Sequence, residues 1–252
     1  ENAPHSAVVI GSGAIGLEFA QFFARLGTEI HVVARRRIFA DVDPEVSDEM
    51  RRVFEDDPHM YLHDEHSPVA VRRVDGGVEV EIEGANGRQK LAVEQVILAT
   101  GRAADVANMG LKEAGIELDG RLIRAGRDMQ TTNPRVFVAG DATGTRQLLH
   151  VANWEGRVAG LGAAQVDGEH LVEERLDVSV VFFDPPMATA GETAAQAEAR
   201  GVDVVTASAR FAETGRAITM DVGHGVFILV ADRATGEILG AQILGPRADD
   251  II

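Results

Sequence analysis

The chain has 252 residues, enough for one large domain or two smaller ones, and its 45% hydrophobic and 25% charged residues are typical of a globular protein. A formal net charge of −16 argues against nucleic acid as a partner, because binding to nucleic acid needs a basic surface. No apolar run reaches the roughly 18 residues of a membrane span, and the first residues do not resemble a signal peptide, so we expect no membrane partner and a cytoplasmic location.

The first predicted elements form a βαβ unit. An apolar strand over 7–10 runs directly into the pattern G-x-G-x-x-G, and a helix is predicted over 14–26. A strand over 30–34 closes the unit within about 30 residues. The helix is interpreted as amphipathic, and its large apolar side chains lie on one stripe, which consists of Ile15, Phe19, Phe22, Phe23 and Leu26.

The glycine-rich turn is predicted to hold the pyrophosphate of a dinucleotide. Gly11 allows the tight turn after the strand, Gly13 lets the backbone approach the pyrophosphate, and Gly16 lets helix and strand pack closely. The phosphates then bind free N–H groups at the helix N-terminus, where the helix dipole also favours them. The alternative, a glycine turn without a nucleotide, is disfavoured by the surrounding βαβ unit. The predicted set is Gly11, Ser12, Gly13, Ala14, Ile15 and Gly16.

The end of the second strand bears on the choice between NAD and NADP. Sites specific for NAD usually carry an acidic residue there, which accepts a hydrogen bond from the ribose 2′-hydroxyl. This chain has Ala34, followed by Arg35, Arg36 and Arg37. Guanidinium groups pair well with phosphate, so the pattern favours the 2′-phosphate of NADP. The alternative is that these arginines form a solvated loop in an arginine-rich protein.

A second helix is predicted to begin at Asp43-Pro44, with Asp as the N-cap and Pro in the first turn. His59, His63 and His66 follow it, and their spacing invites a metal site. Pro58 and Pro68 bracket these histidines, so a solvated loop or a strand edge is the better interpretation. The side of the predicted helix that faces the core consists of Val46, Met50, Val53 and Phe54.

From 69 to 98 the hydrophobic period changes to two, and Asp-Gly-Gly and Asn-Gly supply turns, which predicts a small antiparallel meander and a buried strand over 95–99. The segment 103–135 reads as loop-rich. The character of the chain changes again near residue 177. The remaining predicted elements are a strand over 136–139, a helix over 149–164, a strand over 178–183, a helix over 192–200, a hairpin over 226–231 and 238–244, and the start of a helix at 249–252.

Taken together, these motifs resemble the pyridine nucleotide–disulfide oxidoreductases, and the chain is nearest to the dihydrolipoamide dehydrogenase branch of that family. The segment Gly11–Glu18 resembles the NAD(P) fingerprint with its trailing glutamate, and 136–141 resembles the family's second flavin motif. The matching segments run in family order through the whole chain, namely 11–18, 98–102, 136–141, 148–156, 183–186, 191–197 and 236–246.

The resemblance implies an α/β protein with three parts. Residues 1–125 would form the NAD(P)-binding domain, a Rossmann-like parallel sheet with an antiparallel β-meander. Residues 126–176 would be a remnant of the FAD-binding domain, and 177–252 a partial α+β dimerisation domain. The family's N-terminal half, with its FAD-binding glycines and redox cysteine pair, and its C-terminal His-Glu pair are expected to be missing.

The resemblance also implies roles for individual residues. Glu18 would lie near the nicotinamide ribose, and Arg35 and Arg36, beside Ala34, near the adenosine ribose. Gly101 would line the nicotinamide path, and Arg102 beside it is expected among the cofactor-binding residues. The residues that would face FAD in the intact protein are Gly140, Asp141, Leu149 and His150. No catalytic residue and no metal ligand is expected in this chain.

The implied function is hydride transfer between FAD and NAD(P) in a homodimeric flavoprotein that acts on a dithiol or disulfide. With no cysteine, the chain as given cannot itself perform thiol–disulfide exchange. Pro186 and Ala34 replace acidic residues usual in lipoamide dehydrogenases. Two alternatives therefore stay open: an NADPH-dependent disulfide or mercuric reductase, and a non-catalytic NAD(P)-binding module.

Overall fold

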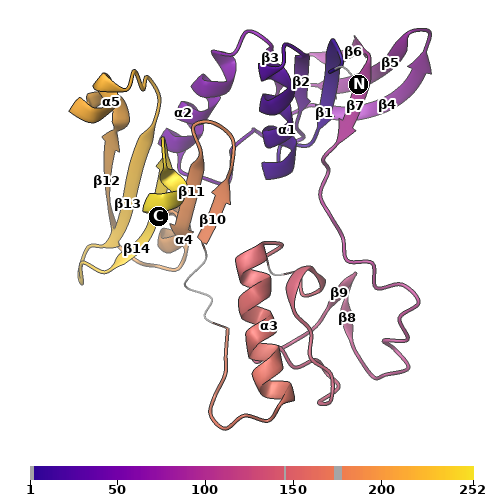
Figure 1. The fold of residues 1–252 in the computed structure, drawn as a ribbon, viewed down its shortest axis with the longest axis vertical. Helices are drawn as coiled ribbons and strands as arrows, with labels where there is room; N and C mark the ends of the chain where they lie inside the picture. Colours follow the sequence, from indigo (N-terminus) through magenta and orange to yellow (C-terminus); the bar gives the residue numbers. More distant parts are fainter. Residues whose placement is uncertain (1–2, 145, 173–177) are drawn as a thin grey trace. The chain divides into compact units, whose positions relative to one another are not determined.

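The computed structural model describes residues 3–144, 146–172 and 178–252, which form two compact units. The first unit combines the segment up to residue 101 with the segment from 178 onward, and the second contains the segment between them (Figure 1). The predicted α/β class, with a parallel sheet and an antiparallel meander, is confirmed. The predicted boundary between 176 and 177 lies outside the described residues, and the boundary at 125 stays a prediction.

A four-stranded parallel sheet is the centre of the first unit. Its strand order is β3-β2-β1-β7, so the strand that leads into the glycine turn occupies an inner position. The segment interpreted as a loop or strand edge supplies β3, which is an edge strand. The bounds are β1 (Ser6–Ile10), β2 (Glu29–Val33), β3 (Met60–His63) and β7 (Gln95–Leu98).

The predicted meander covers one face of this parallel sheet. Side chains alternate between the faces of a strand, so Val8 and Ile10 of β1 point toward the meander and pack with Val80 and Ile82. The turns lie where Asp-Gly and Asn-Gly predict them. The three antiparallel strands are β4 (Ser67–Val74), β5 (Gly77–Gly84) and β6 (Gly87–Val93).

Helix α1 (Ala14–Arg25) packs on the opposite face, but not with the predicted apolar stripe. The buried positions include Gly16, Ala20 and Ala24, which follow one another at four-residue spacing and bring the helix backbone close to β1 and β2. Of the predicted stripe, Phe23 packs against this core, and the other four side chains are exposed. Exposed fractions there are 47–57% for Ile15, Phe19, Phe22 and Leu26. Large apolar residues alone were therefore a wrong guide to the buried face.

Helix α2 (Pro44–Glu55) joins the two segments of the first unit. Its start is as predicted, because the Asp43 carboxylate accepts a hydrogen bond from the Glu45 N–H at 3.0 Å. Met50 and Phe54 are buried in a core that contains residues of both segments. The helix contacts strands β13 and β14 of the second segment. One continuous core therefore holds the parallel sheet and the last segment together.

The last segment forms a five-stranded antiparallel sheet of order β10-β11-β14-β13-β12. The hairpin of β13 and β14 lies where it was predicted, whereas β11 and β12 were not foreseen. The strands are β10 (Val178–Val181), β11 (Met187–Gly191), β12 (Val204–Arg210), β13 (Val226–Asp232) and β14 (Ile238–Leu244), and the short helices are α4 (Ala194–Ala199), η2 (Phe211–Glu213), α5 (Gly215–Thr219) and α6 (Ala248–Ile251).

Polar contacts reinforce this core. The Gln21 side chain is hydrogen-bonded to both the backbone N–H and the backbone C=O of Asp184, and Arg25 pairs with the Asp184 carboxylate at 2.7 Å. At the other end, the nearly buried Glu49 accepts a hydrogen bond from the Gly225 N–H at 3.1 Å. Such bonds fix the register of the two segments, since an unpaired buried polar group would be costly.

The second unit is built around helix α3 (Leu149–Ala163), whose Val158 and Ala159 pack against Met129. The predicted strand over 136–139 does not form; only an isolated bridge joins Phe137 to Gln130. A strand needs neighbours for its backbone groups, and here few are within reach. The other elements are β8 (Leu118–Asp119), β9 (Leu122–Ile123) and the 3-10 helix η1 (Gly140–Ala142). Within the described residues, no helix has the length and apolar character to cross a membrane.

Two histidines of the parallel sheet form a hydrogen-bonded relay. Gln89 Nε2 lies 3.0 Å from Nδ1 of His63, whose Nε2 lies 3.0 Å from Nδ1 of His31, and His31 Nε2 lies 3.2 Å from the Glu29 carboxylate. Because the Gln89 amide donates to His63, that Nδ1 must be unprotonated. Burial, together with the neighbouring His31 and His66, lowers the pKa of His63 to about 4.

We expect this relay to make the protein sensitive to mild acid. Between the ordinary histidine pKa of about 6.5 and the lowered value, the unfolded chain binds a proton that folded His63 does not, so stability falls as pH drops through that range. Partial solvent access limits the loss to about 1–2 kcal/mol. Urea unfolding at pH 7.5 and 4.5 measures it. His63→Gln should reduce the pH dependence, and the exposed His59→Gln should not; equal slopes in all three proteins would refute the expectation.

Candidate functional site

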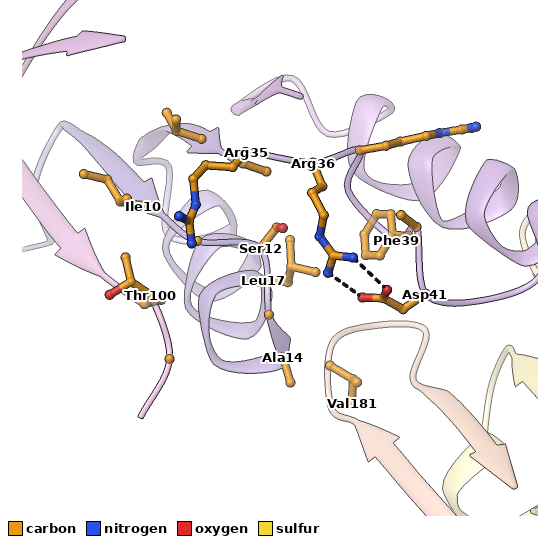
Figure 2. Close-up of a pocket in the computed structure, with 18 of the residues that line it drawn as sticks. Ile10, Ser12, Ala14, Leu17, Arg35, Arg36, Phe39, Asp41, Thr100 and Val181 are labelled. Atoms are coloured by element: carbon orange, nitrogen blue, oxygen red, sulfur yellow. Dashed lines mark hydrogen bonds and ion pairs between the residues drawn. The ribbon is translucent and has the colours of Figure 1, made fainter. Parts of the chain in front are cut away.

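A cavity of about 1030 Å³ in the first unit opens at the carboxyl ends of β1, β2 and β7 (Figure 2). In a parallel sheet this edge is where ligands bind, because the helix N-termini also point there. The glycine turn lines one side and the loop after β2 another. The last segment contributes an apolar wall, which consists of Val181, Phe183 and Met187.

The glycine turn has no room for side chains at two of its positions. Gly11 has φ +112°, and a Cβ atom there would lie 2.2 Å from the backbone oxygen of Ala99. A Cβ atom at Gly16 would lie 2.2 Å from the backbone oxygen of Gly11. Both glycines therefore permit close backbone packing, as the motif predicts.

Gly13 has a different surrounding. It is the N-cap of α1 with an ordinary φ of −73°, and a Cβ atom there would meet nothing within 4 Å. No side chain caps the helix at this point. The N–H groups of the first turn consequently face the cavity, and they form an anion-binding position of the kind that holds pyrophosphate.

The loop after β2 brings three arginines to the cavity, and two of them are already paired. Arg36 makes two bonds to the Asp41 carboxylate, at 3.1 and 2.9 Å, and Arg37 lies 2.5 Å from Asp48. Within the described part of the chain, Arg35 has no hydrogen-bond or ion-pair partner. Figure 2 shows its side chain extending from the loop toward the glycine turn at Ser12.

The predicted dinucleotide residues divide into two groups. The residues that line the cavity are Gly11, Ser12, Gly13, Ala14, Ala34, Arg35, Arg36 and Gly101, whereas Ile15, Gly16, Glu18 and Arg102 do not line it. Glu18 instead accepts a hydrogen bond from the Phe182 N–H at 2.9 Å. Gly16 lies outside the lining and supports the turn by packing closely against Gly11. The nicotinamide-ribose role of Glu18 stays a prediction.

Sequence reasoning missed several lining residues. Asp41 could have been suspected, because it follows the arginine triplet closely and has the opposite charge. Phe39 and Val42, in the same loop, supply apolar surface beside it. No local signal identifies Phe183 or Met187, because they reach the cavity from a segment far along the chain.

The residues expected to face FAD lie in the second unit. Arg102 pairs with Asp141 at 2.9 Å, and Gly140, at φ +76°, donates its N–H to the buried Glu155 at 2.7 Å. Leu149 and His150 are exposed at the start of α3. The N-cap residue of this helix, Leu148, provides no side-chain cap.

Comparison with known proteins follows the same division of the chain. Residues 1–156 match the family described as pyridine nucleotide-disulphide oxidoreductase, and residues 178–252 match the dimerisation domain of that family. The chain is 30% identical over 252 residues to the dihydrolipoyl dehydrogenase of Bacillus subtilis (strain 168), which covers 99% of this chain and 53% of that protein. It is 33% identical over 259 residues to the mercuric reductase of Bacillus cereus, with 100% and 40% covered.

Solved structures agree with this result. The crystal structure of LpdA from Mycobacterium tuberculosis has a TM-score of 0.89 with this chain at 25% identity, and the match covers 99% of this chain and 54% of that one. The chain thus spans about half, or less, of the length of the relatives that it matches.

Proposed function

This chain belongs to the pyridine nucleotide-disulphide oxidoreductase family, and from that membership we propose that it is the NAD(P)-binding part of an FAD-dependent dithiol or disulfide oxidoreductase, most like a dihydrolipoyl dehydrogenase. One observation carries the proposal. The uncapped start of α1, with open space at Gly13, lies in a cavity large enough for much of a dinucleotide. The homology to dihydrolipoyl dehydrogenase supports the choice of reaction.

In the proposed complex the pyrophosphate binds the N–H groups at Gly13 and Ala14. The adenosine lies toward the loop after β2, where Phe39 offers an apolar surface. Arg35, which has no partner among the described residues, offers a cation for a 2′-phosphate. The nicotinamide extends toward Thr100 and Gly101. These residues bind and orient the nucleotide; they do not react with it.

The flavin would supply the acceptor and donor of hydride in the intact protein. Within this chain, Gly140 and Asp141 of η1 and Leu149 and His150 at the start of α3 would hold it. Because the chain has no cysteine, thiol–disulfide exchange must be performed by groups outside it. The match to a dimerisation domain supports a homodimer in the intact enzyme.

An NADPH-dependent reductase, such as a mercuric reductase, is the second candidate. It is favoured by the end of β2, where Ala34 leaves no carboxylate for a ribose 2′-hydroxyl and Arg35 has no partner within the described residues. A mercuric reductase is also among the relatives of this chain. A non-catalytic NAD(P)-binding module stays a further alternative.

Titration of the full chain with NADPH and NADH, followed by nicotinamide fluorescence, tests the proposal. We expect both to bind and NADPH to bind more tightly. Arg35→Gln should raise the Kd for NADPH about tenfold, the value of one charge-assisted pair. The Kd for NADH should change by less than about twofold. Arg73→Gln removes the same charge from an exposed strand position outside the cavity and serves as the control. If neither nucleotide binds the wild-type chain, the proposed function is wrong.

A further inference from the structure

The arginine triplet after β2 is less cationic than its sequence suggests. Arg36 and Arg37 are each matched by one carboxylate, that of Asp41 and that of Asp48. Of these three guanidinium groups, only that of Arg35 has no carboxylate partner within the described residues. The field that a 2′-phosphate would meet is therefore much weaker than that of three free arginines.

The Arg36–Asp41 pair is placed to respond to the nucleotide. Both side chains line the cavity, and Figure 2 shows the two dashed bonds that join them next to Phe39. Their side chains are 73% and 77% exposed, so neither is held rigidly by surrounding protein. A pair this exposed is worth little by itself, and a stronger anion can displace the carboxylate.

The two nucleotides would meet this pair differently. A 2′-phosphate must compete with the Asp41 carboxylate for Arg36 and is repelled by that carboxylate. A ribose with free hydroxyls meets no such repulsion and can donate a hydrogen bond to the carboxylate. Asp41 thus weakens the binding of NADPH and strengthens the binding of NADH.

We propose that Asp41 is a specificity-determining residue that limits the preference of this site for NADPH over NADH. This inference rests on the proposed function, because it assumes that the cavity binds a nicotinamide dinucleotide. It predicts a modest preference for NADPH in the wild-type chain. Arg35 provides this preference, because Arg36 is paired with Asp41.

The test compares Asp41→Asn with the wild-type chain by titration with NADPH and NADH. The amide keeps the size of the side chain but removes its charge, which frees Arg36 for the phosphate. The ratio of the NADH Kd to the NADPH Kd should rise about five- to tenfold, as expected for one added charge-assisted pair. The gain should shrink as salt is raised, because the site is exposed.

Two further variants identify the cause. Arg36→Gln combined with Asp41→Asn should cancel the gain, since the released guanidinium is then absent. Asp75→Asn, in an exposed hairpin turn outside the cavity, makes the same change in net charge and should leave the ratio unchanged. A ratio that stays within about twofold in Asp41→Asn, or that rises equally in Asp75→Asn, overturns the inference while the proposed function stands. Failure of the wild-type chain to bind either nucleotide overturns both.

Discussion

Replacing Gly13 by alanine should weaken the binding of NADPH and NADH at least tenfold without lowering the stability of the protein. The added methyl group projects into the space where the pyrophosphate must approach the backbone, and in the free protein it meets nothing within 4 Å. The φ of −73° suits alanine, and the smaller entropy of the unfolded chain offsets the poorer N-cap, so stability should be nearly unchanged. Fluorescence titration and a thermal melt of the same sample measure the two effects.

Three other glycines make this result interpretable. Gly215→Ala adds a methyl group in equally open space away from the cavity and should leave binding unchanged. Gly11→Ala and Gly16→Ala force a methyl group to within 2.2 Å of a backbone oxygen, so they should lose binding through a damaged fold and a lower Tm. If Gly13→Ala binds both nucleotides as tightly as the wild-type chain, the pyrophosphate position is wrong.

Replacing Glu49 by glutamine should lower the free energy of unfolding by about 2–4 kcal/mol, the cost of disrupting a buried, charge-assisted network. Glu49 is only 5% exposed. Its carboxylate accepts the Gly225 N–H at 3.1 Å and pairs with Arg52 at 2.6 Å, while His224 lies 3.4 Å away. Urea unfolding at pH 7 measures the loss.

The pH dependence of this effect has a definite sign. Burial acts to raise the pKa of Glu49, but the hydrogen bonds from Gly225 and Arg52 outweigh it and hold the pKa below its ordinary value. Its contribution is therefore complete above the pKa of the unfolded glutamate and disappears as pH falls through the lowered value. The difference between wild type and Glu49→Gln should narrow accordingly in acid.

Glu55→Gln is the matched control for Glu49. It lies on the same helix and pairs with Arg51, but its side chain is 53% exposed. This substitution should lower the free energy of unfolding by less than about 0.5 kcal/mol, the usual value of an exposed pair. Equal losses in the two variants would mean that Glu49 does not join the two segments as described.

Local patterns predicted the elements of this fold well where the pattern depends on neighbours in the chain. The glycine turn, the Asp43 cap and the hairpin of β13 and β14 each follow from a few adjacent residues. The buried face of α1 did not, because a row of small residues can lie closer to a sheet than large ones. The expected strand at 136–139 is reduced to an isolated bridge, because few backbone partners lie beside it within the described residues.

The candidate site divides along the same line. Gly11, Gly13 and Arg35 could be named as candidates from the sequence, since the motif places them at the end of a strand or beside it, and all three line the cavity. The opposite wall could not, because Phe183 and Met187 approach only after the last sheet has packed on α2. Pairing of Arg36 with Asp41 also depends on how the loop folds back, which spacing alone does not specify.

The shared core of the first unit has a consequence for biosynthesis. Met50 and Phe54 of α2 are buried partly by residues such as Ile228 and Leu244, which the ribosome adds much later. At roughly 5–20 residues per second, the early segment waits on the order of ten seconds for its covering strands. During that interval an apolar helix face is open to other nascent chains. We therefore expect co-translational holding by chaperones to influence the yield of this protein more than the stability of its finished fold does.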